Sequence, residues 1–340
     1  MIAVLLRAAA VAAVLVALPV TGSAQAPADV AALKSKYRRP ADIPFPASNP
    51  YTPEKAALGK ALYFDPRMSG HQNMNCASCH NPSFGWEVPL KGAIGAQNTM
   101  LARNAPTVLN LAWGKDHYFW DGRAKSLEEQ ALGPIQADVE MNMNLGELVK
   151  RLQGIPEYKK WFDVAFPGEG VSGPNIGKAI ATYERTVVSG YAPFDAWVEG
   201  DESAISDSAK RGFALFNGKA RCAECHTGWN FTDNKFHDIG IDTTDIGRAK
   251  IDPSDPKAKY AFKTPGLRDI TQRAPFSHNG SVADLEGIML HYVSGGIERP
   301  SRSPLMQAVP LLPNEVADVI EFLKTLTGTK QVVSLPVLPN

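Results

Sequence analysis

Apolar residues recur at helical spacing in several stretches of the chain. Segment 54–64 follows Thr52-Pro53 and consists mainly of good helix formers, with proline at a position where a helix tolerates it. Apolar side chains at positions i, i+4 and i+7 predict two further helices, through Ile176, Ile180 and Tyr183 and through Val316, Ile320 and Leu323. Alternating strand patterns are scarce, so we predict an all-α fold with long loops.

The two halves of the chain present the same parts in the same order. A helix ending in Gly-Lys-Ala-Leu-Tyr-Phe at 59–64 precedes one Cys-x-x-Cys-His sequence, and Gly-Phe-Ala-Leu-Phe at 212–216 precedes a second. One of the two amphipathic helices closes each half, and this repeated order favours an internal duplication. The polar stretch 197–203 separates the halves, so we expect domains over 27–199 and 200–340.

The N-terminal stretch has the pattern of an export signal. Arg7 supplies a basic flank, residues 8–20 are an unbroken apolar run, and 21–26 end in small residues that suit signal peptidase. The apolar run is shorter than the ~20 residues that span a bilayer, which argues against the alternative of a membrane anchor. We predict a signal peptide over 1–26, cleaved after Ala26, no membrane span after cleavage and, for a bacterial source, a periplasmic protein.

Composition and charge exclude several classes of protein. The 340 residues are 44% hydrophobic and 21% charged, which is typical of a globular chain with buried cores. Lys+Arg and Asp+Glu both total 35, so no net field attracts nucleic acid or an acidic membrane. Four cysteines are too few for a disulfide framework, so their spacing carries the information.

The cysteines form two Cys-x-x-Cys-His motifs, Cys76-Ala77-Ser78-Cys79-His80 and Cys222-Ala223-Glu224-Cys225-His226. Two thiols at this spacing can bond to both vinyl groups of one haem, and the adjacent histidine can ligate the iron. A shared zinc site would need ligands much closer in sequence, and a redox dithiol would need a neighbouring βαβ pattern. We therefore predict two covalently bound haem c groups, with His80 and His226 as axial ligands.

The sixth coordination position of each iron decides what such a protein does, since a free position can bind peroxide. Five other histidines are more often surface or core residues than ligands. The predicted helix after Ser281 places Leu285, Ile288, Met289 and Tyr292 on one apolar face, while His291 points elsewhere. Met289 or Tyr292 could therefore ligate the second haem, and a plain core stripe is the alternative.

At this point the sequence resembles a known family. The similarity lies in six segments: Phe-Asp-Pro-Arg-Met-Ser-Gly (64–70), Cys-Ala-Ser-Cys-His (76–80), Arg-Asn-Ala-Pro-Thr (103–107), Phe-Trp-Asp-Gly-Arg (119–123), Val-Glu-Met (139–141) and Phe-Lys-Thr-Pro-Gly-Leu-Arg (262–268). Together they resemble the bacterial di-haem cytochrome c peroxidases and their MauG-like relatives over nearly the whole mature chain. The resemblance implies two cytochrome c-like domains, an N-terminal peroxidatic one and a C-terminal electron-transfer one.

The resemblance also implies roles for single residues. His80 resembles the proximal ligand of the haem at which peroxide is cleaved. Glu140 resembles the family's distal acid, and Gln130 its polar neighbour; a carboxylate there can move a proton between the two peroxide oxygens. Trp120 resembles the tryptophan between the two haems. The plain alternatives are a solvated charge for Glu140, an exposed helix position for Gln130 and core packing for Trp120.

A calcium ion between the domains is a further implication of the resemblance. Asn104 resembles its side-chain ligand, and the backbone carbonyls of Thr264 and Gly266 resemble its other protein ligands. Oxygen donors suit calcium, but three residues leave most of the coordination to water.

Two positions depart from the commonest family pattern. Where the classical peroxidases have a distal histidine, this chain has Ala96, which cannot ligate iron. We expect a permanently open peroxide site, unless His71 reaches the iron from its nearby loop. The second departure is Tyr292 in place of methionine, which is the MauG-like choice; an anionic oxygen ligand should lower the potential of the second haem.

Two functions compete. The first is a peroxidase that reduces hydrogen peroxide to water with electrons from a small cytochrome c or copper protein, and we rank it narrowly ahead. The second is a MauG-like oxidase that modifies residues of a partner protein. Ala96 and Glu140 argue against a third possibility, a dihaem electron carrier without catalysis. A homodimer is compatible with the sequence.

Overall fold

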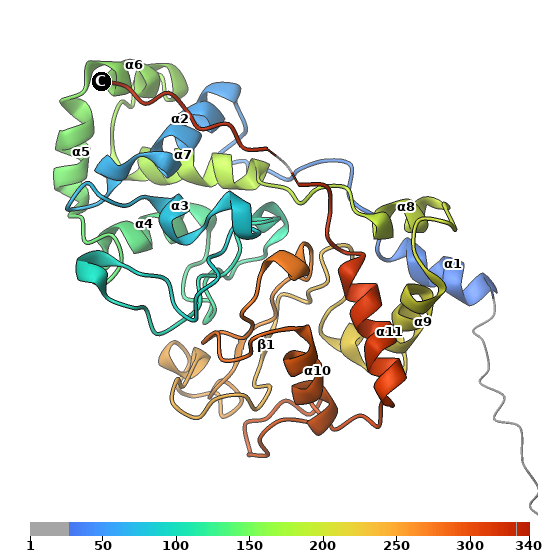
Figure 1. Cartoon of the computed structure of the whole chain (residues 1–340). Coiled ribbons are helices and arrows are strands. Elements are labelled where there is room, and N and C mark those ends of the chain that lie inside the picture. Colours follow the sequence, from blue (N-terminus) through green and yellow to red (C-terminus); the bar gives the residue numbers. More distant parts are fainter. Residues whose placement is uncertain (1–26, 331) are drawn as a thin grey trace, which may run out of the picture.

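The structure, a computed structural model, describes residues 27–330 and 332–340, so the expected export signal lies outside the described residues. Two short strands, β1 (Phe236–His237) and β2 (Phe262–Lys263), pair antiparallel. The helices are α1 (Pro27–Ser35), α2 (Pro53–Phe64), α3 (Cys76–Cys79), α4 (Leu127–Gln136), α5 (Leu145–Gln153), α6 (Pro156–Ala165), α7 (Gly173–Thr186), α8 (Pro193–Glu199), α9 (Asp207–Asn217), α10 (Leu285–Ser294) and α11 (Pro313–Lys324) (Figure 1). The predicted mainly helical fold is confirmed. No described helix is long and apolar enough to cross a membrane.

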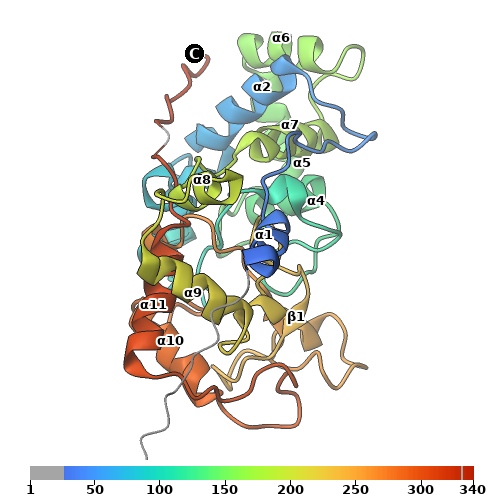
Figure 2. The same ribbon diagram turned by 90° about the vertical axis from the view of Figure 1, so that its right-hand side faces the viewer.

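Each half is built around one close helix pair. Helix α2 begins at Thr52, whose side chain accepts the backbone N–H of Lys55, and it packs on α7. A Cβ at Gly59 would overlap the carbonyl oxygen of Ala179, so glycine allows the two backbones to meet. In the second half, α9 and α11 lie side by side (Figure 2), and a Cβ at Gly212 would overlap the carbonyl oxygen of Asp318.

These glycines give the register of the duplication. Because Gly59 corresponds to Gly212, Ala179 corresponds to Asp318, and counting onward matches Tyr183 with Phe322. Tyr183 thus matches Phe322 and not Leu323, although Leu323 is the residue that shares its place in the apolar pattern. The sequence pattern of α11 did not reveal this, because the helix buries Phe322 and Leu323 together, and only the close approach of the backbones fixes which residue faces the partner helix.

The two cores do not follow the order of the sequence. Tyr37, Phe194 and Trp197 pack in the second core with α9 and α11, although they precede residue 200. The C-terminal tail crosses back to the first half, where Val333 and Leu338 pack against the core around α2 and α7 (Figure 1). A segment near each end of the chain thus packs against the half to which it does not belong in sequence.

Candidate functional site

The first Cys-x-x-Cys-His motif forms the short helix α3. Asn75 caps it by accepting the backbone N–H of Ser78, and the Ser78 hydroxyl in turn accepts the backbone N–H of Asn75. The backbone N–H of His80 donates to the carbonyl of Cys76 at 2.9 Å. Both cysteines therefore sit on one turn that ends at the histidine.

His80 lines an open cavity of about 850 Å³ together with Trp120 and Gln130. Burial lowers the pKa of His80 to about 4, so its imidazole is neutral and able to bind a metal. Its Nδ1 and the Oε1 of Gln130 are buried without a hydrogen-bond partner among the described residues. Such unpaired polar atoms beside a cavity fit a site built for a bound group.

The second motif lines a larger cavity, of about 1480 Å³. The Nδ1 of His226 lies 2.9 Å from the carbonyl oxygen of Phe231, which fixes the ring and leaves Nε2 available as a ligand atom. Burial lowers the pKa of His226. Met289 and Tyr292 of α10 line the same cavity. His291 lies off this face, because its Nε2 is 2.9 Å from the carbonyl oxygen of Ile239.

Both sites fit haem c. Each combines a histidine that follows a pair of cysteines, a burial-lowered histidine pKa that favours the neutral imidazole, and a largely apolar cavity that the histidine lines. In the second site, burial raises the pKa of Tyr292 well above its usual range, so the phenol keeps its proton until a cation such as iron compensates the phenolate.

Trp120 lies where the two cavities meet, and its ring lines both. The indole N–H donates to the carbonyl of Asn104 at 2.9 Å, and the Trp120 carbonyl accepts the backbone N–H of Lys263 at 2.8 Å. Lys263 also lines both cavities. The ring is thus held by Asn104 of the first half, and the backbone of Trp120 is bonded to Lys263 of the second half.

Glu140 follows α4 and lies apart from the lining of the first cavity, as far as the described residues define it. Its backbone carbonyl accepts the N–H of Ala96 at 2.8 Å, so the position expected for a distal histidine lies beside it. Burial raises the pKa of Glu140, and Arg123 opposes this shift; burial, and after it the charge of Glu140, raises the pKa of Cys79. The carboxyl group therefore lies within electrostatic range of the first motif. His71 is exposed on its loop.

The residues expected to bind calcium are engaged in other bonds. The Asn104 amide donates to the carbonyl of Leu90 at 3.0 Å. The carbonyl of Thr264 accepts the Thr232 hydroxyl at 2.6 Å, and that of Gly266 accepts the guanidinium of Arg273 at 2.7 Å. The cationic side chain of Arg273 at one of the three oxygen donors disfavours a second cation there, and the calcium site implied by the resemblance stays a prediction.

Sequence reasoning missed the buried charges at the junction of the cavities. Lys263 donates to the carbonyl of His117 at 2.8 Å, and burial lowers its pKa to about 8. Arg273 pairs with Glu87 at 2.7 Å, and both are almost fully buried. Lys263 belongs to the segment 262–268 that carries the resemblance, but nothing in the sequence indicates that Arg273 and Glu87 meet.

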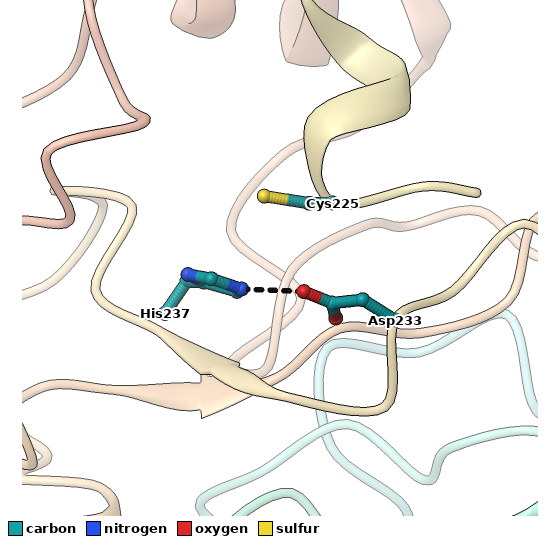
Figure 3. Close-up of side chains that lie close together, drawn as sticks. All are labelled: Cys225, Asp233 and His237. Carbon is teal, nitrogen blue, oxygen red and sulfur yellow. Dashed lines mark hydrogen bonds and ion pairs between the residues drawn. The ribbon is translucent and has the colours of Figure 1, made fainter.

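One cluster has the composition of a metal site: Cys225, Asp233 and His237 (Figure 3). His237 Nε2 and Asp233 Oδ2 are 2.8 Å apart, and this bond is the main reason that the pKa of His237 rises to about 9. Cys225 belongs to the second Cys-x-x-Cys-His motif, where haem attachment would convert its sulfur to a thioether. We therefore read the cluster as an ion pair beside the second haem.

Comparisons with known proteins agree with this site. A family model described as di-haem cytochrome c peroxidase matches residues 53–203, and one described as cytochrome c matches residues 209–327. The chain is 50% identical over 314 residues to the methylamine utilization protein MauG of Methylorubrum extorquens, covering 92% of this chain and 89% of that protein. It is 34% identical over 334 residues to the cytochrome-c peroxidase IdrP1 of a Pseudomonas species, covering 88% and 87%.

A solved structure shares the fold. The crystal structure of a MauG-like protein associated with microbial copper homeostasis superposes with a TM-score of 0.78 at 29% identity, covering 85% of this chain and 95% of that one. Both halves are cytochrome c-like, which implies two c-type haems. The two motifs, their cavities and these similarities lead to one conclusion: the chain belongs to the di-haem cytochrome c peroxidase family, which includes the MauG proteins.

Proposed function

We propose that this protein reduces hydrogen peroxide at the first haem site and draws the electrons through the second. The observation that carries this proposal is Trp120, which lines both cavities and is bonded through its indole to Asn104 and through its backbone to Lys263. Haem c supplies peroxide reduction at the His80 site and electron transfer at the His226 site when bound. The motif cysteines and these two histidines would hold the cofactors. The domains 27–199 and 200–340 would then be peroxidatic and electron-transferring.

Glu140 is the proton-handling group in this proposal. Its raised pKa keeps part of the carboxyl protonated closer to neutral pH, which suits a group that must take up and return a proton. Gln130 lines the first cavity with a buried, unpaired amide oxygen among the described residues, and its amide would orient a hydrogen-bonded oxygen atom. Ala96, buried beside Glu140, leaves this face free of a competing histidine ligand.

The electron source is, in our proposal, a partner protein whose residues are oxidised, as in MauG. The 50% identity to a MauG protein exceeds the 34% identity to a peroxidase. Tyr292 lines the second cavity, and a phenolate ligand there would lower the potential and disfavour electron uptake from a high-potential donor. A small cytochrome c or copper protein is the second candidate, because several relatives of about one-third identity are cytochrome-c peroxidases.

One assay separates the two electron sources. The holoprotein, isolated in the ferric state, is mixed with hydrogen peroxide and reduced cytochrome c while both spectra are recorded. We expect the haem spectrum to change within the dead time and cytochrome c to be oxidised slowly. Fast, sustained oxidation of cytochrome c would establish the peroxidase instead, and an unchanged haem spectrum would contradict the whole proposal.

Glu140 is tested by its amide variant. Glu140→Gln keeps the size of the side chain and removes the proton-exchanging group, so peroxide cleavage should slow by roughly 10²–10⁴-fold. Glu129→Gln, on the first turn of α4, is the control. An unchanged rate in Glu140→Gln would remove this residue from the mechanism.

The remaining parts of the proposal concern location and metals. The predicted signal over 1–26 would deliver the protein to the periplasm, where c-type haem is attached. Calcium is not part of the proposed function, because Arg273 already provides a cation at the carbonyl of Gly266.

A further inference from the structure

Three aromatic rings pack behind the first haem motif. They are Tyr63, Trp86 and Tyr183, all buried. The ring centroids of Tyr63 lie 5.8 Å from Trp86 and 5.3 Å from Tyr183, and the last two are 6.4 Å apart. The Tyr63 hydroxyl donates to the carbonyl of His80 at 3.2 Å. We call these three residues the first triad.

The second half contains the same triangle made of phenylalanine. The centroids of Phe216 lie 5.9 Å from Phe231 and 5.1 Å from Phe322, and the last two are 6.0 Å apart. The three side chains are buried and pack in the second core.

The duplication makes these positions equivalent one by one. The register given by Gly59 and Gly212 matches Tyr63 with Phe216, and the register of α7 and α11 matches Tyr183 with Phe322. Trp86 and Phe231 both follow the motif histidine by a few residues in a left-handed conformation, with φ of 62° and 55°. All three oxidisable rings of the first triad are thus replaced by a ring that resists oxidation.

The two halves also differ at a fourth position, next to the first triad. Glu184 adjoins Tyr183 and corresponds to Leu323 in the second half. It is 4% exposed, and its Oε2 lacks a hydrogen-bond partner among the described residues. Burial raises its pKa to about 8, and its charge adds to the effect of burial in raising the pKa values of Tyr63 and Tyr183. Above about pH 8 this group is a carboxylate, which stabilises the positive charge that forms when an electron leaves a ring and can accept a phenolic proton.

We propose that the first triad is an electron reserve for the peroxide-cleaving site, used when no outside donor is bound. This rests on the proposed function, which supplies hydrogen peroxide as the oxidant. Reduction of one peroxide to two waters takes two electrons and two protons. Tyr63 and Tyr183 together provide both as they become two tyrosyl radicals, with Trp86 as the ring that passes electrons between them and the site. The matching triangle of the second half consists of phenylalanine and cannot serve in this way.

The second half itself shows how to test the reserve. The variant Tyr63→Phe/Trp86→Phe/Tyr183→Phe copies the phenylalanine triangle, whose ring centroids lie at nearly the same distances as those of the first triad. Holoprotein is mixed with hydrogen peroxide without donor and frozen within milliseconds for electron paramagnetic resonance. We expect the parent protein to show an organic radical signal. That signal should become narrower when the protein is made with ring-deuterated tyrosine, and it should be lost in the triple variant. Tyr191→Phe, at an exposed tyrosine, should leave it unchanged.

The outcomes separate this inference from the proposed function. If peroxide changes the haem spectrum but the radical signal persists in the triple variant, the electron reserve is refuted and the proposed function stands. If peroxide leaves the haem spectrum unchanged, both are refuted. Where the triple variant does not fold, each single phenylalanine variant and Glu184→Leu are measured instead, at a pH above 8 where Glu184 is ionised. The phenylalanine variants should diminish the signal, and Glu184→Leu should shorten its lifetime. An unchanged signal in all four refutes the reserve.

Discussion

Arg273→Met tests whether a buried ion pair holds the junction of the two cavities. The Arg273 Nε donates to Glu87 Oε1 at 2.7 Å, and its Nη1 donates to the carbonyls of Gly266 and Arg268 at 2.7 and 3.1 Å. Methionine fills part of the volume but donates no hydrogen bond. Glu87 would then be left buried with one remaining donor, the backbone N–H of Thr107 at 3.1 Å.

The expected cost is large because both partners are shielded from water. Removing one member of a buried pair typically costs about 3–5 kcal/mol, most of it from the charge that is left behind. Burial already raises the pKa of Glu87, and Arg273 opposes that shift. Without the guanidinium, the folded state binds a proton at Glu87 more tightly than the unfolded state, so the free energy of unfolding falls as pH rises. The variant should therefore lose less stability near pH 5 than near pH 7.5.

Denaturant unfolding of the holoprotein, followed by tryptophan fluorescence as the haems separate from the rings, measures this loss. The matched control is the double variant Glu87→Gln/Arg273→Met, which removes both charges and should recover most of the stability, because a neutral pair leaves no buried ion. A loss below about 1 kcal/mol in Arg273→Met, or a double variant no more stable than the single one, would refute the reasoning.

The other predictions concern the second haem site, the packing of α9 on α11, the ion pair of His237 with Asp233, and calcium. Tyr292→Met should raise the midpoint potential of the second haem and change its absorption spectrum; an unaltered potential and spectrum would assign the sixth ligand to another side chain of α10. Gly212→Ala should lower the free energy of unfolding by about 1–3 kcal/mol, because its Cβ would overlap the backbone of α11; unchanged thermal unfolding would contradict this close approach. The pair of His237 and Asp233 raises the pKa of His237 to about 9, so its stabilisation is complete below the ordinary histidine pKa of about 6.5 and is lost as pH rises through about 9; His237→Gln should flatten the stability profile in that window. Chelation of calcium should leave the melting temperature unchanged, and a drop would restore the calcium site that Arg273 argues against.

Local sequence information predicted the features that depend on a few neighbouring residues. A Cys-x-x-Cys-His motif places two sulfurs and an imidazole on one turn by covalent geometry alone, so both haem sites were recognisable. The helix after Thr52 was predictable because capping and proline placement act within one turn. Met289 and Tyr292 were expected to share one face of a helix, and both line the second cavity.

Features made by contacts between distant segments were decided only by the tertiary structure. Periodicity left the register of α11 uncertain by one residue, because Phe322 and Leu323 are both apolar; the contact of Gly212 with the α11 backbone selects Phe322. The pairing of Glu87 with Arg273 and the burial of Glu184 depend on which segments meet, since a charged residue in sequence carries no record of its solvent exposure. The sequence thus determined the two cofactor motifs and the helices through short-range chemistry. The folded chain decided what surrounds each motif, because burial and charge pairing arise only when residues far apart in the sequence come together.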